Sequence, residues 1–197
     1  MARTGRPRSF DADVALDKAM RLFWAEGYEG ASLNELTEAM GINRRSIYAA
    51  YGNKEELFRK AVDRYLAGPG AFVAKALDQP TARQVAEAML HGCADAYTTP
   101  GCPRGCLLVQ SALACGPEGE PARAGLAARR ESGVGALRER FERAQREGDL
   151  PEPVDADALA RYLTAVGQGI SVQAAGGAGR EDLHRVADQA LAAWPGS

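Results

Sequence analysis

Four cysteines are the first residues of this 197-residue chain whose spacing could support chemistry. All of them fall within 23 residues, at Cys93, Cys102, Cys106 and Cys115. Thiolates bind soft metals and react with oxidants, and a helix starting near Arg104 would stabilise a thiolate at Cys106. The gaps differ from the two-residue spacing of common zinc motifs, and cysteine is also a frequent core residue. We therefore expect either inert packing or a thiol-based sensor of redox state or metal, and assign no metal site.

Basic side chains form the second group that could do chemistry. Arg44 and Arg45 are adjacent, and Lys54 follows them. Three more cations lie at the N-terminal tip: Arg3, Arg6 and Arg8. Arginine pairs with guanine edges and with phosphates. The net charge of −2 is therefore compatible with DNA binding through a small footprint, because these cations are clustered.

Signatures of catalysis are missing from the sequence. It contains no Gly-rich phosphate loop, no nucleophile elbow and no metal-binding pair of histidines. The two histidines, His91 and His184, have no triad setting. We expect a protein that is not an enzyme and that carries no cofactor.

Helices must position these residues. The chain is 46% hydrophobic, its apolar residues recur at helical spacing, and long alternating runs of β-branched residues are missing. This pattern predicts an all-α fold whose first helix covers residues 11–26 and ends at Gly27. No apolar run approaches the roughly 18 residues of a membrane helix, and the N-terminus carries no secretion signal. We expect a cytoplasmic protein with no membrane partner.

The sequence around Arg44 predicts two short helices joined by a tight turn. Ser32 and Glu35 form a capping box, and Gly41 ends the helix that they begin. Asn43 is a suitable N-cap for the next helix, residues 44–51. This is a helix-turn-helix pattern, in which the N-terminal residues of the second helix meet base edges in the major groove.

Residues 5–66 resemble the DNA-binding domain of TetR/AcrR-type transcriptional regulators. The matching residues are Leu22-Phe23, Gly27-Tyr28, Leu33, Leu36, Met40-Gly41-Ile42, Ser46-Ile47-Tyr48 and the run from Tyr51 to Phe58. By position, the resemblance implies DNA contacts at Asn43, Arg44, Arg45, Ser46, Tyr48 and Lys54, with Ser32 and Asn34 as phosphate donors. The basic tip, with Arg6 and Arg8, resembles arms that enter an adjacent minor groove.

The resemblance also implies a head on a larger helical body. We expect a helix-turn-helix DNA-binding domain over residues 1–66, with the arm at 1–9 and the motif at about 29–51. Residues 67–197 would form a helical regulatory and dimerisation domain. Apolar stripes on the last two helices could be monomer core, but the resemblance favours a homodimer interface. Its residues would be Leu159, Val166, Gly167, Ile170, Leu183, Val186, Ala190 and Trp194.

The middle helices would line a ligand cavity. Candidate residues are Met89, Cys93, Tyr97, Leu107, Leu108, Phe141 and Tyr162. The expected function is a ligand-responsive repressor, which a small molecule of unknown identity releases from a palindromic DNA operator. The alternative is a regulator that senses oxidants or metal through the cysteines between residues 93 and 115.

Overall fold

The computed structural model describes residues 10–113 and 119–195, and over those ranges its regular elements are all helices. They are α1 (Ala12–Gly30), α2 (Leu33–Met40), α3 (Arg44–Tyr51), α4 (Lys54–Ala67), α5 (Phe72–Ala76), α6 (Ala82–Ala96), α7 (Leu107–Leu113), α8 (Glu120–Arg146), α9 (Ala156–Ala175) and α10 (Arg180–Leu191). The predicted all-α class is confirmed. Within the described ranges, no helix is long and apolar enough to cross a membrane.

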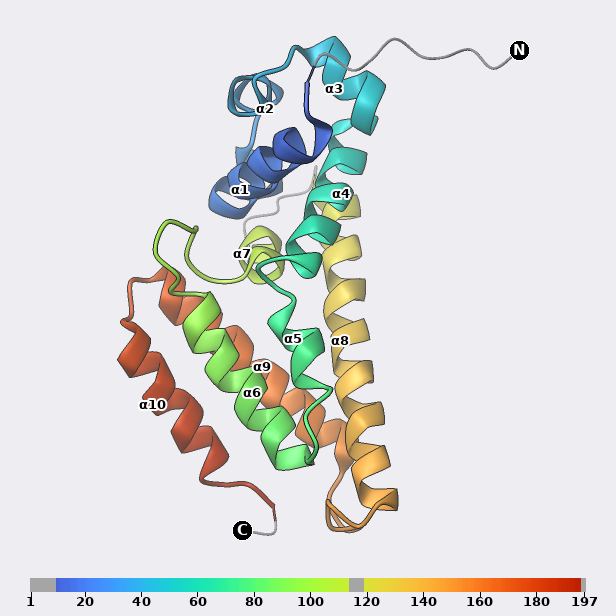
Figure 1. The fold of residues 1–197 in the computed structure, drawn as a ribbon, viewed down its shortest axis with the longest axis vertical. Coiled ribbons are helices and arrows are strands. Elements are labelled where there is room, and N and C mark those ends of the chain that lie inside the picture. The colour runs from blue at the N-terminus through green and yellow to red at the C-terminus, as the bar shows by residue number, and fades with distance from the viewer. Residues whose placement is uncertain (1–9, 114–118, 196–197) are drawn as a thin grey trace, which may run out of the picture.

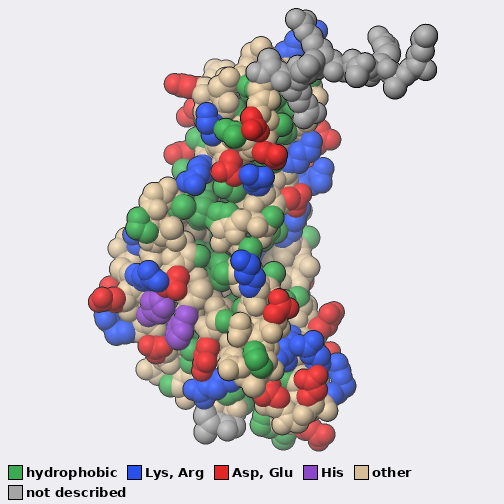
Figure 2. Space-filling model, viewed as in Figure 1, with side chains coloured by type: hydrophobic (Ala, Val, Ile, Leu, Met, Phe, Trp, Pro, Cys, Tyr) green, Lys and Arg blue, Asp and Glu red, His purple; other side chains and the backbone are tan. Residues whose placement is uncertain are grey.

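The molecule is elongated, with α1–α4 forming a head at one end and α5–α10 forming a body (Figure 1). The long helix α8 runs down one side of the body and packs against α9 and, near the head, against α4. Helix α6 lies between α9 and α10 and packs on both. Helix α3 stands at the end of the molecule that is farthest from the body (Figure 1). Charged side chains of both signs are spread over the face that Figure 2 shows.

Aromatic rings fill the core of the head. The Phe23 ring, fully buried on α1, meets Phe58 of α4 edge to face at a centroid distance of 5.0 Å. Tyr28 packs against Phe58 at 5.1 Å and stacks on Phe23 at 6.4 Å, and Trp24 meets Tyr65 at 4.9 Å. Such pairs add about 0.5–1.5 kcal/mol each beyond the area they bury. This cluster fixes α1 on α4 and so provides a rigid base for α2 and α3.

The head is joined to the body by hydrogen bonds from α1. The buried Trp24 indole Nε1 donates to the Gly105 carbonyl at 2.9 Å, and Arg21 donates to the Gly101 carbonyl at 3.1 Å. Gly105 has φ of +81°, and a Cβ there would stand 2.8 Å from the Ser171 carbonyl oxygen. Only glycine fits this loop without strain, so the segment before α7 can lie between α1 and α9.

Several helix boundaries differ from the sequence prediction. Helix α1 continues to Gly30, although its geometry is broken at Gly27, where φ is 73°. The helix expected from Arg104 begins only at Leu107, and the expected end of that helix at Cys115 lies outside the described residues. The apolar positions of the last helix continue to Trp194 in the sequence, but the helix ends at Leu191. The two short helices predicted around the turn agree with α2 and α3.

Candidate functional site

The turn between α2 and α3 is set by local capping. Ser32 Oγ accepts the Glu35 N–H at 3.2 Å, and the Glu35 carboxylate accepts the Ser32 N–H at 2.8 Å. Hydrogen bonds from the Ser32 hydroxyl and the Ser32 backbone N–H to the carboxylate lower the pKa of Glu35. Gly41 ends α2 with a left-handed φ of 69°, and Asn43 Oδ1 accepts the Ser46 N–H at 2.9 Å to begin α3. The predicted helix-turn-helix is confirmed, since both caps are present.

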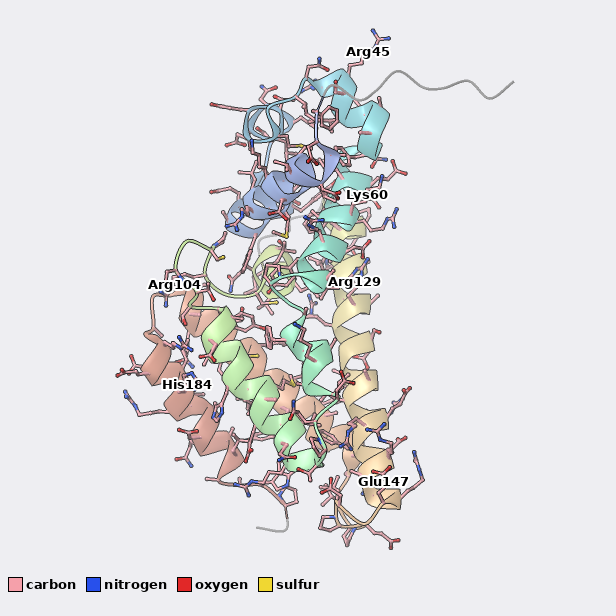
Figure 3. The ribbon with its side chains drawn as sticks, viewed as in Figure 1. Arg45, Lys60, Arg104, Arg129, Glu147 and His184 are labelled. Carbon is pink, nitrogen blue, oxygen red and sulfur yellow. The ribbon has the colours of Figure 1, made fainter. Side chains whose placement is uncertain are left out.

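Helix α3 presents a polar face to solvent. Ile47 is fully buried on its inner side, whereas Arg44 and Arg45 are exposed and Tyr48 is 45% exposed. Arg45 projects from the end of the molecule, away from the body (Figure 3). No ion pair to either arginine occurs among the described residues. The two guanidinium groups are therefore accessible to an anionic partner.

The two tyrosines of α3 have different roles, one buried and one on the surface. The Tyr51 hydroxyl donates to the Ala12 carbonyl at 2.6 Å, and its ring is buried. Tyr51 thus ties α3 to the start of α1. Tyr48 is the phenol on the open face, as the site prediction placed it.

The other predicted DNA contacts surround this face. Arg44 Nη2 donates to Asn34 Oδ1 at 3.4 Å, which links α3 to α2. Lys54 Nζ stands 4.7 Å from the centre of the Tyr28 ring, and burial lowers the pKa of Lys54. The face of the Tyr28 ring therefore attracts the Lys54 ammonium group. Arg6 and Arg8 lie outside the described residues.

A cavity of about 140 Å³ lies in the body among α4–α9. Its wall includes Met89, Cys93, Tyr97 and Leu108, which the sequence predicted as pocket residues. Residues that the prediction missed come mainly from other helices: Tyr65, Phe72, Cys106, Arg129, Arg130 and Gln168. Cys106 stood in the sequence as part of the cysteine group, but no sequence signal separates Arg129 and Arg130 from the other arginines of α8.

Three predicted pocket residues do not line this cavity. Leu107 and Phe141 are fully buried but do not line the cavity, because Leu107 packs in the core and Phe141 packs against Trp194 at 6.1 Å. Tyr162 is 45% exposed on the outer side of α9 and lines a surface hollow shared with α10. Helical periodicity marks all three as apolar positions, but it does not tell which neighbour each one faces.

Family comparisons match both parts of the chain. The family model for bacterial regulatory proteins of the tetR family matches residues 15–61, and the model for a tetracyclin repressor-like C-terminal domain matches residues 83–190. The chain belongs to the TetR family. Its members are regulators, so the expectation of a regulator and not an enzyme is confirmed.

Curated and solved relatives of this TetR-family protein extend over nearly the whole chain. The repressor ComR of Escherichia coli is 34% identical and covers 97% of this chain and 92% of its own. A cysteine mutant of the regulator CifR was solved with 26-bp double-strand operator DNA. It is 45% identical, has a TM-score of 0.92, and covers 97% of this chain and 100% of its own. A regulator from Rhodococcus sp. RHA1 is 40% identical with a TM-score of 0.60, covering 94% of this chain and 100% of its own.

The predicted interface residues of this TetR-family chain separate into two groups. Val166, Val186 and Ala190 line the surface hollow on α9 and α10, together with Tyr162. Ile170 and Leu183 are fully buried within the protomer, and Gly167 faces Cys93 in the cavity wall. These three contact their own chain in the structure, so the prediction that they meet a second copy has no support from their burial. Leu159 is half-buried, and Trp194 is nearly buried beside Phe141.

The cysteines do not form the arrangement expected near Arg104. Arg104 Nε donates to the Ala174 carbonyl at 2.7 Å, at the end of α9, so the arginine is engaged there and not with a thiolate. Burial raises the pKa of Cys93 to about 12, which keeps that thiol neutral at pH 7. The described residues hold no group of three or more metal-ligating side chains; Cys115 lies outside them.

Proposed function

We propose that this TetR-family chain is a repressor, that it binds a palindromic DNA operator as a homodimer in the cytoplasm, and that a small molecule releases it. The observation that carries the proposal is the exposed, ion-pair-free face of α3 at the end of the molecule. The likeness to CifR, solved with operator DNA, supports the same mode of binding. The proposal also includes a DNA-binding domain over residues 1–66 and a regulatory and dimerisation domain over residues 67–197.

The DNA contacts follow from the orientation of α3. Arg44 and Arg45 lie in its first turn, the part of a recognition helix that meets base edges. Bidentate pairing of an arginine with guanine gives about 1–3 kcal/mol of discrimination. Asn43, Ser46 and Tyr48 flank the arginines, while Ser32, Asn34 and Lys54 lie within reach of phosphates. An arm at residues 1–9 would add Arg6 and Arg8 in the minor groove.

Dimerisation would use the outer face of α9 and α10. One helix-turn-helix makes few contacts, so a two-fold dimer on a palindrome is the usual solution, with half-sites about 34–36 Å apart. Tyr162, Val166 and Val186 offer an accessible apolar surface for the second copy, and Ala190, largely buried, lines the same hollow. Leu159 and Trp194 would support this surface from beneath.

Release would arise from the cavity. A molecule that binds there better when the heads are spread lowers the population of the DNA-competent state. Coupling of about 1–3 kcal/mol would weaken operator binding roughly 5- to 150-fold. The loop before α7 lines the cavity at Cys106 and bonds α1 at Gly105, which provides a direct route from cavity to head.

Operator binding is tested with the DNA upstream of the protein's own gene. Affinity measured by fluorescence anisotropy should fall steeply across a salt series, because phosphate contacts release counterions. Arg45→Ala should cost about 1–3 kcal/mol if this residue reads a base. The control is Arg143→Ala, since Arg143 lies near the far end of α8. A chain that stays monomeric, or that binds all sequences equally, would contradict the proposal.

A second candidate, a thiol-based switch, is favoured by one observation. Cys106 lines the cavity directly beside Gly105, the residue bonded to Trp24, and Cys102 Sγ lies 3.9 Å from Arg21 Nη1. Oxidation at either thiol would disturb a contact of α1. Replacing Cys102 and Cys106 with serine should abolish release by an oxidant if the thiols are the sensor. Unchanged release would exclude this candidate.

A further inference from the structure

The formal charges in the cavity wall are all of one sign. Among the described lining residues, only Arg129 and Arg130 carry a charge at neutral pH, and Asp63, which pairs with Arg129, lies outside the cavity wall. Most of the remaining wall is apolar, as at Phe72, Leu108 and Leu137. The inner wall stays neutral because burial raises the pKa values of Cys93 and Tyr97. The cavity thus combines an apolar interior with two fixed cations.

Both guanidinium groups retain free hydrogen-bond donors. Arg130 Nη1 donates to the Leu108 carbonyl at 2.9 Å, and Arg129 Nη2 lies 2.6 Å from Asp63 Oδ1 on α4. The described residues supply no further partner to either group, and a guanidinium has five N–H donors. Its planar fork matches the two oxygens of a carboxylate.

Arg130 also stands where the cavity approaches the surface. Together with Gln168 it lines two outer hollows next to the cavity, one beside Glu131 and Arg161 and the other beside Arg123. An anion that enters between α8 and α9 would meet the Arg130 guanidinium and the Gln168 amide before it reaches the apolar interior.

We propose that the cavity binds a small carboxylate with an apolar body about the size of one benzene ring, its carboxylate held by Arg129 and Arg130. The volume of about 140 Å³ supports this size, because an apolar cavity of roughly 150 Å³ admits benzene. Phe72, Leu108 and Leu137 surround the apolar body.

The same binding would act on the head through Arg129. A ligand carboxylate competes with Asp63 for the Arg129 guanidinium, and Asp63 lies on α4, which leads from the helix-turn-helix into the body. Only this step rests on the proposed function. Binding of the carboxylate by itself does not require that the chain bind DNA.

Isothermal titration calorimetry on the full chain, without DNA, tests the ligand class with benzoate and its neutral counterpart, benzyl alcohol. Benzoate should bind at least about 10-fold more tightly, and Arg130→Met should weaken benzoate about 10- to 100-fold while leaving benzyl alcohol unchanged. Arg129→Met should act in the same direction. Arg143→Met, on the same helix but outside the cavity, should behave like the unmodified chain.

Equal binding of benzoate and benzyl alcohol to the unmodified chain would overturn the inference, and so would the absence of benzoate binding. Both results are measured on the unmodified chain, so they do not depend on whether a variant folds. Operator binding is measured separately by anisotropy. If the chain binds no operator but does bind benzoate, the proposed function fails and the ligand class stands; the reverse result overturns the ligand class alone.

Discussion

The end of the head and the cavity of the body hold their arginines in opposite ways. Arg44 and Arg45 stand in solvent on α3 and form no ion pair in the described ranges of the chain. Arg129 and Arg130 stand half-buried on α8, each engaged with a group from another helix. The first pair suits a large anion that approaches from outside, whereas the second suits a small one that enters a cavity. The difference teaches that the surroundings of an arginine decide the size of the anion that it can bind.

The largest effect is expected when the aromatic packing beneath α3, the helix that carries Arg44 and Arg45, is removed. Phe23→Ala should destabilise the protein by about 3–5 kcal/mol, because it empties a fully buried ring site beside Phe58. Urea unfolding followed by circular dichroism measures the loss. Tyr48→Ala, at a 45%-exposed position, should change stability by less than about 0.5 kcal/mol. Similar losses for the two variants would argue against the aromatic core as the support of α3.

The contact between the two regions is the next target. Trp24→Phe leaves the buried Gly105 carbonyl without its donor and should cost about 1–3 kcal/mol of stability. If this bond carries the signal, the variant should also bind operator with less sensitivity to the cavity ligand. Anisotropy titrations with and without ligand give two operator dissociation constants, and their ratio measures this sensitivity. An unchanged ratio would show that coupling runs through another contact, such as Arg129 with Asp63.

Two capping residues, one in the head and one in the body, allow an effect on operator binding to be separated from an effect on stability. Asn43 caps α3 in the head, and Thr81 caps α6 in the body. Replacing either with alanine should cost about 1 kcal/mol, in a range of roughly 0.5–2 kcal/mol. Only Asn43→Ala should also weaken operator binding, since of these two helices we propose that only α3 meets the DNA. Equal effects of the two variants on affinity would mean that the cap acts through global stability.

The smallest effect is expected from pH. Asp95 on α6 is partly buried, which raises its pKa, but hydrogen bonds from His184 at 2.6 Å and Arg180 at 2.7 Å lower it below its ordinary value overall. A lowered pKa in the folded state means that this contribution is complete above about pH 4 and is lost as pH falls further. Asp95→Asn should therefore flatten the stability curve only below about pH 4. Thermal melts over pH 3–6 provide the measurement, and a flattening centred near neutral pH would contradict the assignment.

Local signals explain why the head could be predicted from the sequence. Ser32 with Glu35, Asn43 and Gly41 act on residues three or four positions away, so their caps and turn appear directly in the chain order. The same N-cap at Asn43 places Arg44 and Arg45 in the first turn of α3.

The cavity depends on contacts that chain order does not contain. Tyr65, Cys106, Arg129 and Gln168 come from four segments, and only packing brings them together. The same limit applies at Ile170 and Leu183, which are buried within the chain: an apolar stripe on a helix predicts that the stripe is covered, but not whether the same chain or a second copy covers it.

The hydrogen bond from Trp24 to Gly105 has a practical use. The chain has two tryptophans, Trp24 at the contact between head and body and Trp194 beside Phe141. Replacing Trp194 with phenylalanine would leave one indole, whose emission wavelength and lifetime respond to its hydrogen bonding and to the polarity around it. Such a chain would report its own domain movement in real time, without any attached dye.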